Sequence, residues 1–170
     1  TWHIVVDCLM KTVTTSAMIF TILIGAILFN NFLVLSAVPD AIGTWIGALP
    51  FSSTVIMLII LLIYLVMGCA LDSLAMILLT IPIFFPVVQS LGFDLIWFGI
   101  VVIMVTEISL ITPPVGMNVF VLKSMLPDVS LWTIFAGIGP FFVADLVRLS
   151  LVVLFPPIAL WLPSVMLSTG

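Results

Sequence analysis

The stretch EISLITPPVGMN, residues 107 to 118, interrupts apolar sequence with a carboxylate, two hydroxyls, two adjacent prolines, a glycine and an asparagine. Adjacent prolines break a helix because proline has no backbone N–H and its ring clashes with the preceding turn. In lipid, the carbonyl groups that such a break frees are costly unless protein, water or an ion pairs with them. The stretch therefore predicts either a simple proline kink or a site at which broken backbone binds a ligand.

The composition is that of a membrane protein, since 65% of the 170 residues are hydrophobic and 6% are charged. A water-soluble domain needs more charge to cover its surface, and the apolar runs are too many for a signal peptide. There is no basic cluster, phosphate loop or zinc pattern, so nucleic acid binding has no support. The two cysteines, Cys8 and Cys69, are expected to be small packing residues. Because the chain begins at Thr1, we expect it to be a piece of a longer polypeptide.

The apolar runs predict an all-α membrane protein, a polytopic helical bundle with a re-entrant helical hairpin and a broken transmembrane helix. The predicted elements are a spanning helix (12–38), an interfacial segment (39–50), a helical hairpin (51–90, tip at 68–73), a broken helix (95–125, break at 112–116) and a last spanning helix (131–163). Both hairpin arms are short for a hydrocarbon layer about 30 Å thick. This favours a tip inside the membrane, with two full spans as the alternative. Placing Lys11 and Lys123 on the cytoplasmic side is compatible with either arrangement of residues 51–90, so this rule does not choose between them.

A second polar interruption, GCALDS at residues 68 to 73, is expected to share one site with the proline break. Broken helices of transporters offer carbonyl oxygens and helix ends to ions and substrates near the middle of the bilayer. Sodium is a hard cation and prefers oxygen ligands. Gly68 permits close backbone approach, and Asp72 or Ser73 can cap the helix that follows.

The residues of the proline break have complementary expected roles. Thr112 offers a hydroxyl and a carbonyl, whereas Pro113 and Pro114 remove two N–H donors and so free upstream carbonyls. Gly116 lets the chain return to helix, and Asn118 serves either a ligand or the opposite backbone. As a set, these groups offer oxygen atoms to a cation.

The remaining charged and polar positions are interpreted one by one. Glu107 is expected to be either part of the site or a structural carboxyl bonded to a neighbouring helix. Asp145 and Arg148, three apart on one helix face, predict a structural ion pair. His3 and Tyr64 are expected to pack or to lie at a boundary. An aromatic belt accounts for the tryptophans near predicted span ends, which are Trp45, Trp97, Trp132 and Trp161.

In order along the chain, the motifs GCALDS, GFDLIWFG, EISLITPPVGMNVFVLK, PDV and ADLVRL resemble the C-terminal half of the large membrane subunit of TRAP transporters, the tripartite ATP-independent periplasmic transporters. The resemblance extends from about TTSAMIF to LWLP. It implies one half of an inverted-repeat, elevator-type transporter and no enzyme activity. It also implies sodium-coupled uptake of an organic acid anion across the bacterial inner membrane, such as a C4-dicarboxylate, sialic acid or a similar carboxylate.

The same resemblance implies partners and a sodium site. The partners are a small membrane subunit, a periplasmic substrate-binding protein, the N-terminal half of the large subunit and the lipid bilayer. The sodium ligands would be mainly backbone carbonyls of Gly68, Ser109, Thr112 and Val115, helped by the Thr112 hydroxyl. Many members of the family have glycine or alanine where Ser109 stands. A second sodium site and much of the substrate pocket would belong to the N-terminal half.

Three alternatives stay open from the sequence. A related anion and sodium symporter would need no binding protein. An intramembrane enzyme would use Glu107 or Asp72 as acid or base, but the sequence lacks a nucleophile–base pair or metal ligands to accompany them. The third alternative is a structural membrane subunit that does not transport.

Overall fold

The computed structural model describes residues 2–113 and 116–168, and within these residues the regular structure is entirely helical. In chain order the helices are α1 (Trp2–Leu35), α2 (Val38–Gly47), α3 (Ser53–Gly68), α4 (Ser73–Ser90), α5 (Leu95–Ser109), α6 (Met117–Met125), α7 (Leu131–Leu154) and α8 (Pro157–Ser168). Among the described helices, α1, α4 and α7 are long and apolar enough to cross a membrane. The predicted class, an all-α membrane protein, is confirmed.

The first helix is longer than the predicted span over 12–38, because it begins at Trp2 and ends at Leu35. Its first turns contain His3, Asp7 and Lys11, which lie before the predicted span. His3 Nδ1 lies 3.1 Å from Asp7 Oδ2, one turn later. No proline or glycine separates these turns from the apolar part, so the helix continues through them. Ala37, with a φ of 52°, then turns the chain into α2, a short helix that covers most of the predicted interfacial segment over 39–50.

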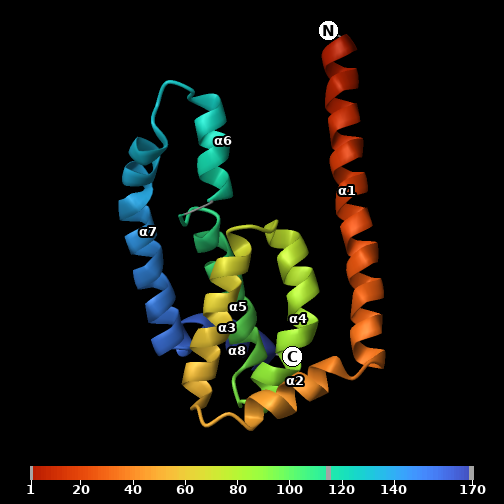
Figure 1. Cartoon of the computed structure of the whole chain (residues 1–170), viewed down its shortest axis with the longest axis vertical. Helices are drawn as coiled ribbons and strands as arrows, with labels where there is room; N and C mark the ends of the chain where they lie inside the picture. The colour runs from red at the N-terminus through yellow and green to blue at the C-terminus, as the bar shows by residue number, and fades with distance from the viewer. Residues whose placement is uncertain (1, 114–115, 169–170) are drawn as a thin grey trace.

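Helices α3 and α4 form a hairpin that turns at residues 69–72. Ser52 Oγ accepts the Val55 N–H at the start of α3, and Asp72 caps the start of α4. Figure 1 shows the turn lying beside the interruption between α5 and α6, while α1 and α6 extend well past it. The hairpin therefore reaches only part of the way along the molecule.

Helix α5 is the centre of the fold and packs against α3, α4, α7 and α8. It is apolar around most of its circumference, which is typical of a helix enclosed by others, and Val101, Val102 and Ile108 are fully buried. Tyr64 of α3 is also fully buried, and its ring centroid lies 6.3 Å from that of Phe98 in an edge-on arrangement. The expectation that Tyr64 packs is thus confirmed.

Trp97 is not part of an aromatic belt, because it is only 3% exposed and stacks on Phe93. Its indole Nε1–H donates to the carbonyl oxygen of Val152 at 2.9 Å. That carbonyl has no helical donor, since the residue four positions later is Pro156, which lacks an N–H. Trp97 therefore pairs with a carbonyl that a proline has freed.

The last predicted span, residues 131–163, is two helices. Helix α7 ends at Leu154 and α8 begins at Pro157, and Phe155 has left the helical region at φ −126° and ψ 72°. A residue before proline avoids the helical conformation for steric reasons, and Pro156 follows Phe155.

Within α7, Arg148 Nη2 lies 3.0 Å from Asp145 Oδ1, as expected for the ion pair.

Candidate functional site

The hairpin turn and the proline break meet at Gly68, the last residue of α3, and Ser109, the last residue of α5. A Cβ atom added to Gly68 would overlap Ser109 Oγ and lie 2.8 Å from Ser109 Cβ. Real Cβ atoms do not approach so closely, so the absence of a side chain at Gly68 is what permits this contact. We call the contact between residues 68–69 and residues 109–112 the tip–break contact.

Cys69 makes the second part of the tip–break contact. Its Sγ lies 3.7 Å from the Ser109 carbonyl oxygen and 3.9 Å from the Thr112 carbonyl oxygen, and 3.2 Å from Leu65 O in its own helix. Two carbonyls of the break are therefore directed towards the hairpin turn. The sequence interpretation treated Cys69 only as a packing residue, and its position next to Gly68 was the available signal.

Both hydroxyl groups of the break donate back to their own helix. Ser109 Oγ lies 2.5 Å from Thr106 O, and Thr112 Oγ1 lies 2.6 Å from Ile108 O. A hydroxyl has one proton and two lone pairs. With their protons committed, these oxygens keep lone pairs that suit a cation.

The backbone of the break closes through tight turns. The Thr112 N–H donates to Ser109 O at 3.2 Å, and across the break the Asn118 N–H donates to Leu110 O at 3.2 Å. Gly116 has a φ of 50°, which glycine tolerates best, and its carbonyl accepts the Val119 N–H as α6 begins. The backbone N–H of Asn118 thus pairs across the break, while its side chain is exposed and its expected role stays a prediction.

Not every residue of the predicted site reaches the tip–break contact. Pro113 is exposed at the break. Pro114 and Val115, the latter a predicted sodium ligand, lie outside the described residues.

Asp72, rather than Ser73, is the cap of α4. Its Oδ2 accepts the N–H groups of Leu74 at 3.1 Å and Ala75 at 3.2 Å. Ser73 is the first residue inside the helix. Both residues therefore lie at the start of α4, the second arm of the hairpin.

Glu107 points away from the tip–break contact. It lies two residues before Ser109, which corresponds to about 200° around a helix of 3.6 residues per turn. Ser109 is fully buried against the hairpin, whereas Glu107 is exposed. Within the described residues no hydrogen bond or ion pair to its carboxylate is recorded, so it is not placed to support this contact.

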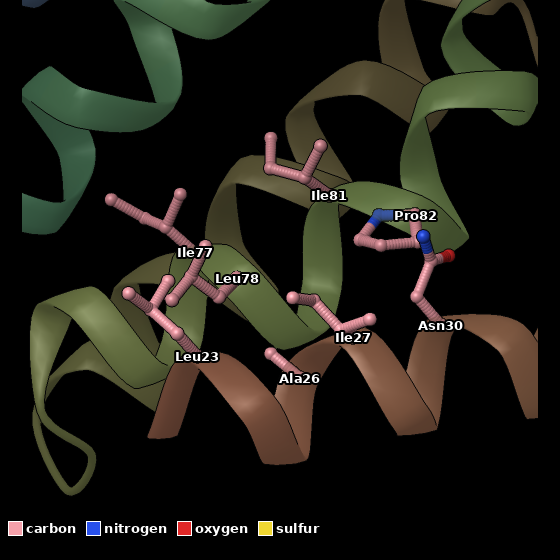
Figure 2. Close-up of a pocket in the computed structure, with 8 residues that line it drawn as sticks. All are labelled: Leu23, Ala26, Ile27, Asn30, Ile77, Leu78, Ile81 and Pro82. Carbon is pink, nitrogen blue, oxygen red and sulfur yellow. The ribbon is translucent and has the colours of Figure 1, made fainter. Parts of the chain in front are cut away.

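A separate cavity of about 310 Å³ lies between α1 and α4. Figure 2 shows its lining, in which the Asn30 side chain extends from α1 towards Pro82 of α4. The other lining residues are aliphatic, namely Leu23, Ala26, Ile27, Ile77, Leu78 and Ile81. A surface of this kind does not favour an anion, and the cavity is separate from the tip–break contact.

Comparison with known proteins supports the predicted resemblance. The family model described as tripartite ATP-independent periplasmic transporter, DctM component, matches residues 1–158. The chain is 30% identical over 165 residues to the sialic acid TRAP transporter large permease protein SiaM of Vibrio cholerae, covering 97% of this chain and 38% of that protein. It is 34% identical over 156 residues to the C4-dicarboxylate TRAP transporter large permease protein DctM of Pseudomonas aeruginosa, covering 92% of this chain and 36% of that protein.

A third relative is the isethionate TRAP transporter permease protein DctMQ of Oleidesulfovibrio alaskensis, 34% identical over 115 residues, which cover 68% of this chain and 18% of that protein. The chain thus spans little more than a third of the length of SiaM and DctM, and less of DctMQ. Because the family model matches nearly the whole chain, the chain belongs to the DctM component family of tripartite ATP-independent periplasmic transporters.

Proposed function

We propose that this chain is the C-terminal half of a large permease subunit that couples sodium entry to uptake of an organic acid anion, and that sodium binds at the tip–break contact. The observation that carries the proposal is the approach of Gly68 to Ser109, with the Ser109 and Thr112 carbonyls directed towards the hairpin turn. Two interrupted backbone segments that meet in an otherwise apolar protein are the arrangement by which transporters bind cations.

The chemistry of the tip–break contact suits sodium better than an anion. Its polar atoms are carbonyl oxygens and hydroxyl oxygens whose protons are already donated, and hard cations prefer such oxygens. We propose the carbonyls of Gly68, Ser109, Thr112 and Val115 and the Thr112 hydroxyl as ligands. The weakly polar Cys69 thiol now lies near two of these carbonyls, and sodium would replace its contacts with stronger ones.

Sodium bound in this way joins two segments that are distant in the sequence. The hairpin of α3 and α4 and the interrupted pair of α5 and α6 would then move as one body. We propose that this body carries substrate across the membrane by an elevator motion relative to α1. The apolar, incompletely filled boundary between α1 and α4 supports a contact that can slide.

The relatives' names support a substrate class, and the family description supports a set of partners. Sialic acid, C4-dicarboxylate and isethionate transporters all handle organic acids, so we propose an organic acid anion as substrate. The family is described as tripartite. We therefore propose a small permease subunit and a periplasmic binding protein as partners, in the bacterial inner membrane.

Reconstituted uptake tests this function. The complete large subunit and its small subunit are placed in proteoliposomes, and uptake of labelled sialic acid and C4-dicarboxylates is measured with and without the binding protein. We expect uptake of one of these anions only with the binding protein and an inward sodium gradient, and none with a potassium gradient. Uptake without the binding protein would favour an independent symporter, and no uptake under any gradient would favour a structural subunit.

A further inference from the structure

One face of α5 is left open although this helix is the centre of the fold. Ile96 is 45% exposed and Ile103 is 55% exposed, and Glu107, also exposed, lies one turn further along. Their spacings of seven and four residues place them on one helical stripe. We call Ile96, Ile103 and Glu107 the α5 stripe.

A carboxylate at this position cannot face lipid at low cost. Glu107 lies about 20 Å along α5 from its N-cap, at a rise of about 1.5 Å per residue, and the hydrocarbon layer is about 30 Å thick. Ionisable side chains at such depth face protein or water and pair with other groups. The α5 stripe is therefore a contact surface or the wall of an aqueous passage.

None of the lysines and arginines of this chain, all of which the structure describes, pairs with Glu107. Arg148 pairs with Asp145, and Lys123 Nζ donates to Pro127 O and Val129 O at 2.8 and 2.7 Å. Lys11, the remaining one of the three lysines and arginines, belongs to α1, which packs on α2 and α4. A cationic partner for Glu107 has to come from another segment.

We propose that the α5 stripe is the surface against which the rest of the large permease polypeptide packs, and that a lysine or arginine of that part pairs with Glu107. Most of the length of SiaM and DctM lies outside the segment that this chain matches, which leaves ample polypeptide to cover the stripe. A bare carboxylate on an anion passage would repel the substrate. This inference rests on the proposed transporter function, because that function places α5 in the membrane.

Photo-crosslinking identifies the occupant of the stripe. Benzoylphenylalanine replaces Ile103 in the full-length large subunit, expressed with its small subunit, and adducts formed in native membranes are mapped by mass spectrometry. We expect the adduct on a large-subunit peptide outside residues 1–170. An adduct on the small subunit, on lipid or within residues 1–170 overturns the proposal. Because this readout needs no transport, its failure is distinct from a failure of sodium-coupled uptake.

The charge pairing has its own test in the same full-length complex. Glu107→Gln is expected to lower the melting temperature by several degrees, because one partner of a buried pair is left uncompensated. Asp128→Asn, which removes an exposed carboxylate from the loop before α7, is the control and should leave it unchanged. Changing the basic residue in the crosslinked peptide to glutamine should recover most of the loss in the Glu107→Gln background. Equal melting temperatures for the Glu107 and Asp128 variants overturn the pairing.

Discussion

At the scale of single residues, Gly68 and Ser109 occupy space that cannot hold one more methyl group. We predict that Gly68→Ala forces the hairpin turn away from the break and lowers uptake by the full complex at least tenfold, since overpacking of this kind costs about 1–3 kcal/mol. Gly137→Ala is the matched control, because a Cβ there would meet nothing within 4 Å. Uptake by proteoliposomes is the measurement.

A second substitution tests whether this clash is the cause. Ser109→Gly removes the two atoms that clash with the new methyl group and leaves only Met76 Cε, at 3.4 Å, close to it. The double variant Gly68→Ala, Ser109→Gly should therefore regain most of the lost uptake. Normal uptake by Gly68→Ala, or an inactive double variant, would contradict the claim that uptake requires the close contact between Gly68 and Ser109.

Gly68 and Thr112 were predictable because their chemistry is local, whereas Ser109 was implied only by the family resemblance and the contact of Cys69 was not predicted. Glycine beside polar residues, and prolines that remove donors, mark interrupted backbone in any apolar sequence. The role of Trp97 was not predictable, because its partner carbonyl lies 55 residues away. Nothing near Trp97 in the sequence distinguishes it from the exposed Trp45, whereas the structure shows that Pro156 frees the carbonyl it binds.

At the scale of elements, the Trp97 hydrogen bond joins α5 to the C-terminal end of α7. Trp97→Phe keeps an aromatic ring against Phe93 but leaves the Val152 carbonyl unpaired, which costs about 1–3 kcal/mol for a buried group. We predict a lower melting temperature of the purified complex and no change for Trp45→Phe, whose ring is exposed. Equal effects of the two substitutions would exclude a role for the indole N–H.

Asp72 caps the start of α4, and this structural role can be separated experimentally from electrostatic attraction of sodium by its carboxylate. Asp72→Ala should destabilise the hairpin by about 1 kcal/mol because two backbone N–H groups lose their acceptor. Asp72→Asn keeps an acceptor oxygen, so we predict near-normal stability and an unchanged sodium concentration for half-maximal uptake. A raised sodium requirement in Asp72→Asn alone would show that the carboxylate attracts the cation.

Element types were easier to predict than their ends. Hydropathy identified apolar helices, but it could not show that α1 extends back to Trp2, since a lone charge per turn does not stop a helix. The division between α7 and α8 depends on which prolines are tolerated. Pro140 and Pro163 lie inside helices, whereas Pro156 ends one. The Val152 carbonyl that Pro156 frees is bound by Trp97, a partner that the local sequence does not reveal.

At the scale of the whole molecule, the chain brings its two interruptions together without help from another segment. The hairpin turn and the break are adjacent in Figure 1, although some forty residues of sequence separate Cys69 from Ser109. The Glu107 face of α5 remains open. The residues of the proposed sodium site therefore come together within this chain, and the α5 stripe stays open for the proposed contact with the rest of the permease.

The most direct test of sodium binding at the tip–break contact is a sodium titration of uptake by the full complex carrying Thr112→Val. Valine keeps the shape of threonine and deletes the hydroxyl, whereas Thr112→Ser keeps the hydroxyl and is the control. We predict that Thr112→Val raises the sodium concentration for half-maximal uptake about tenfold, equivalent to roughly 1.4 kcal/mol, and that Thr112→Ser stays near the wild type. An unchanged sodium dependence in Thr112→Val would contradict sodium binding by Thr112.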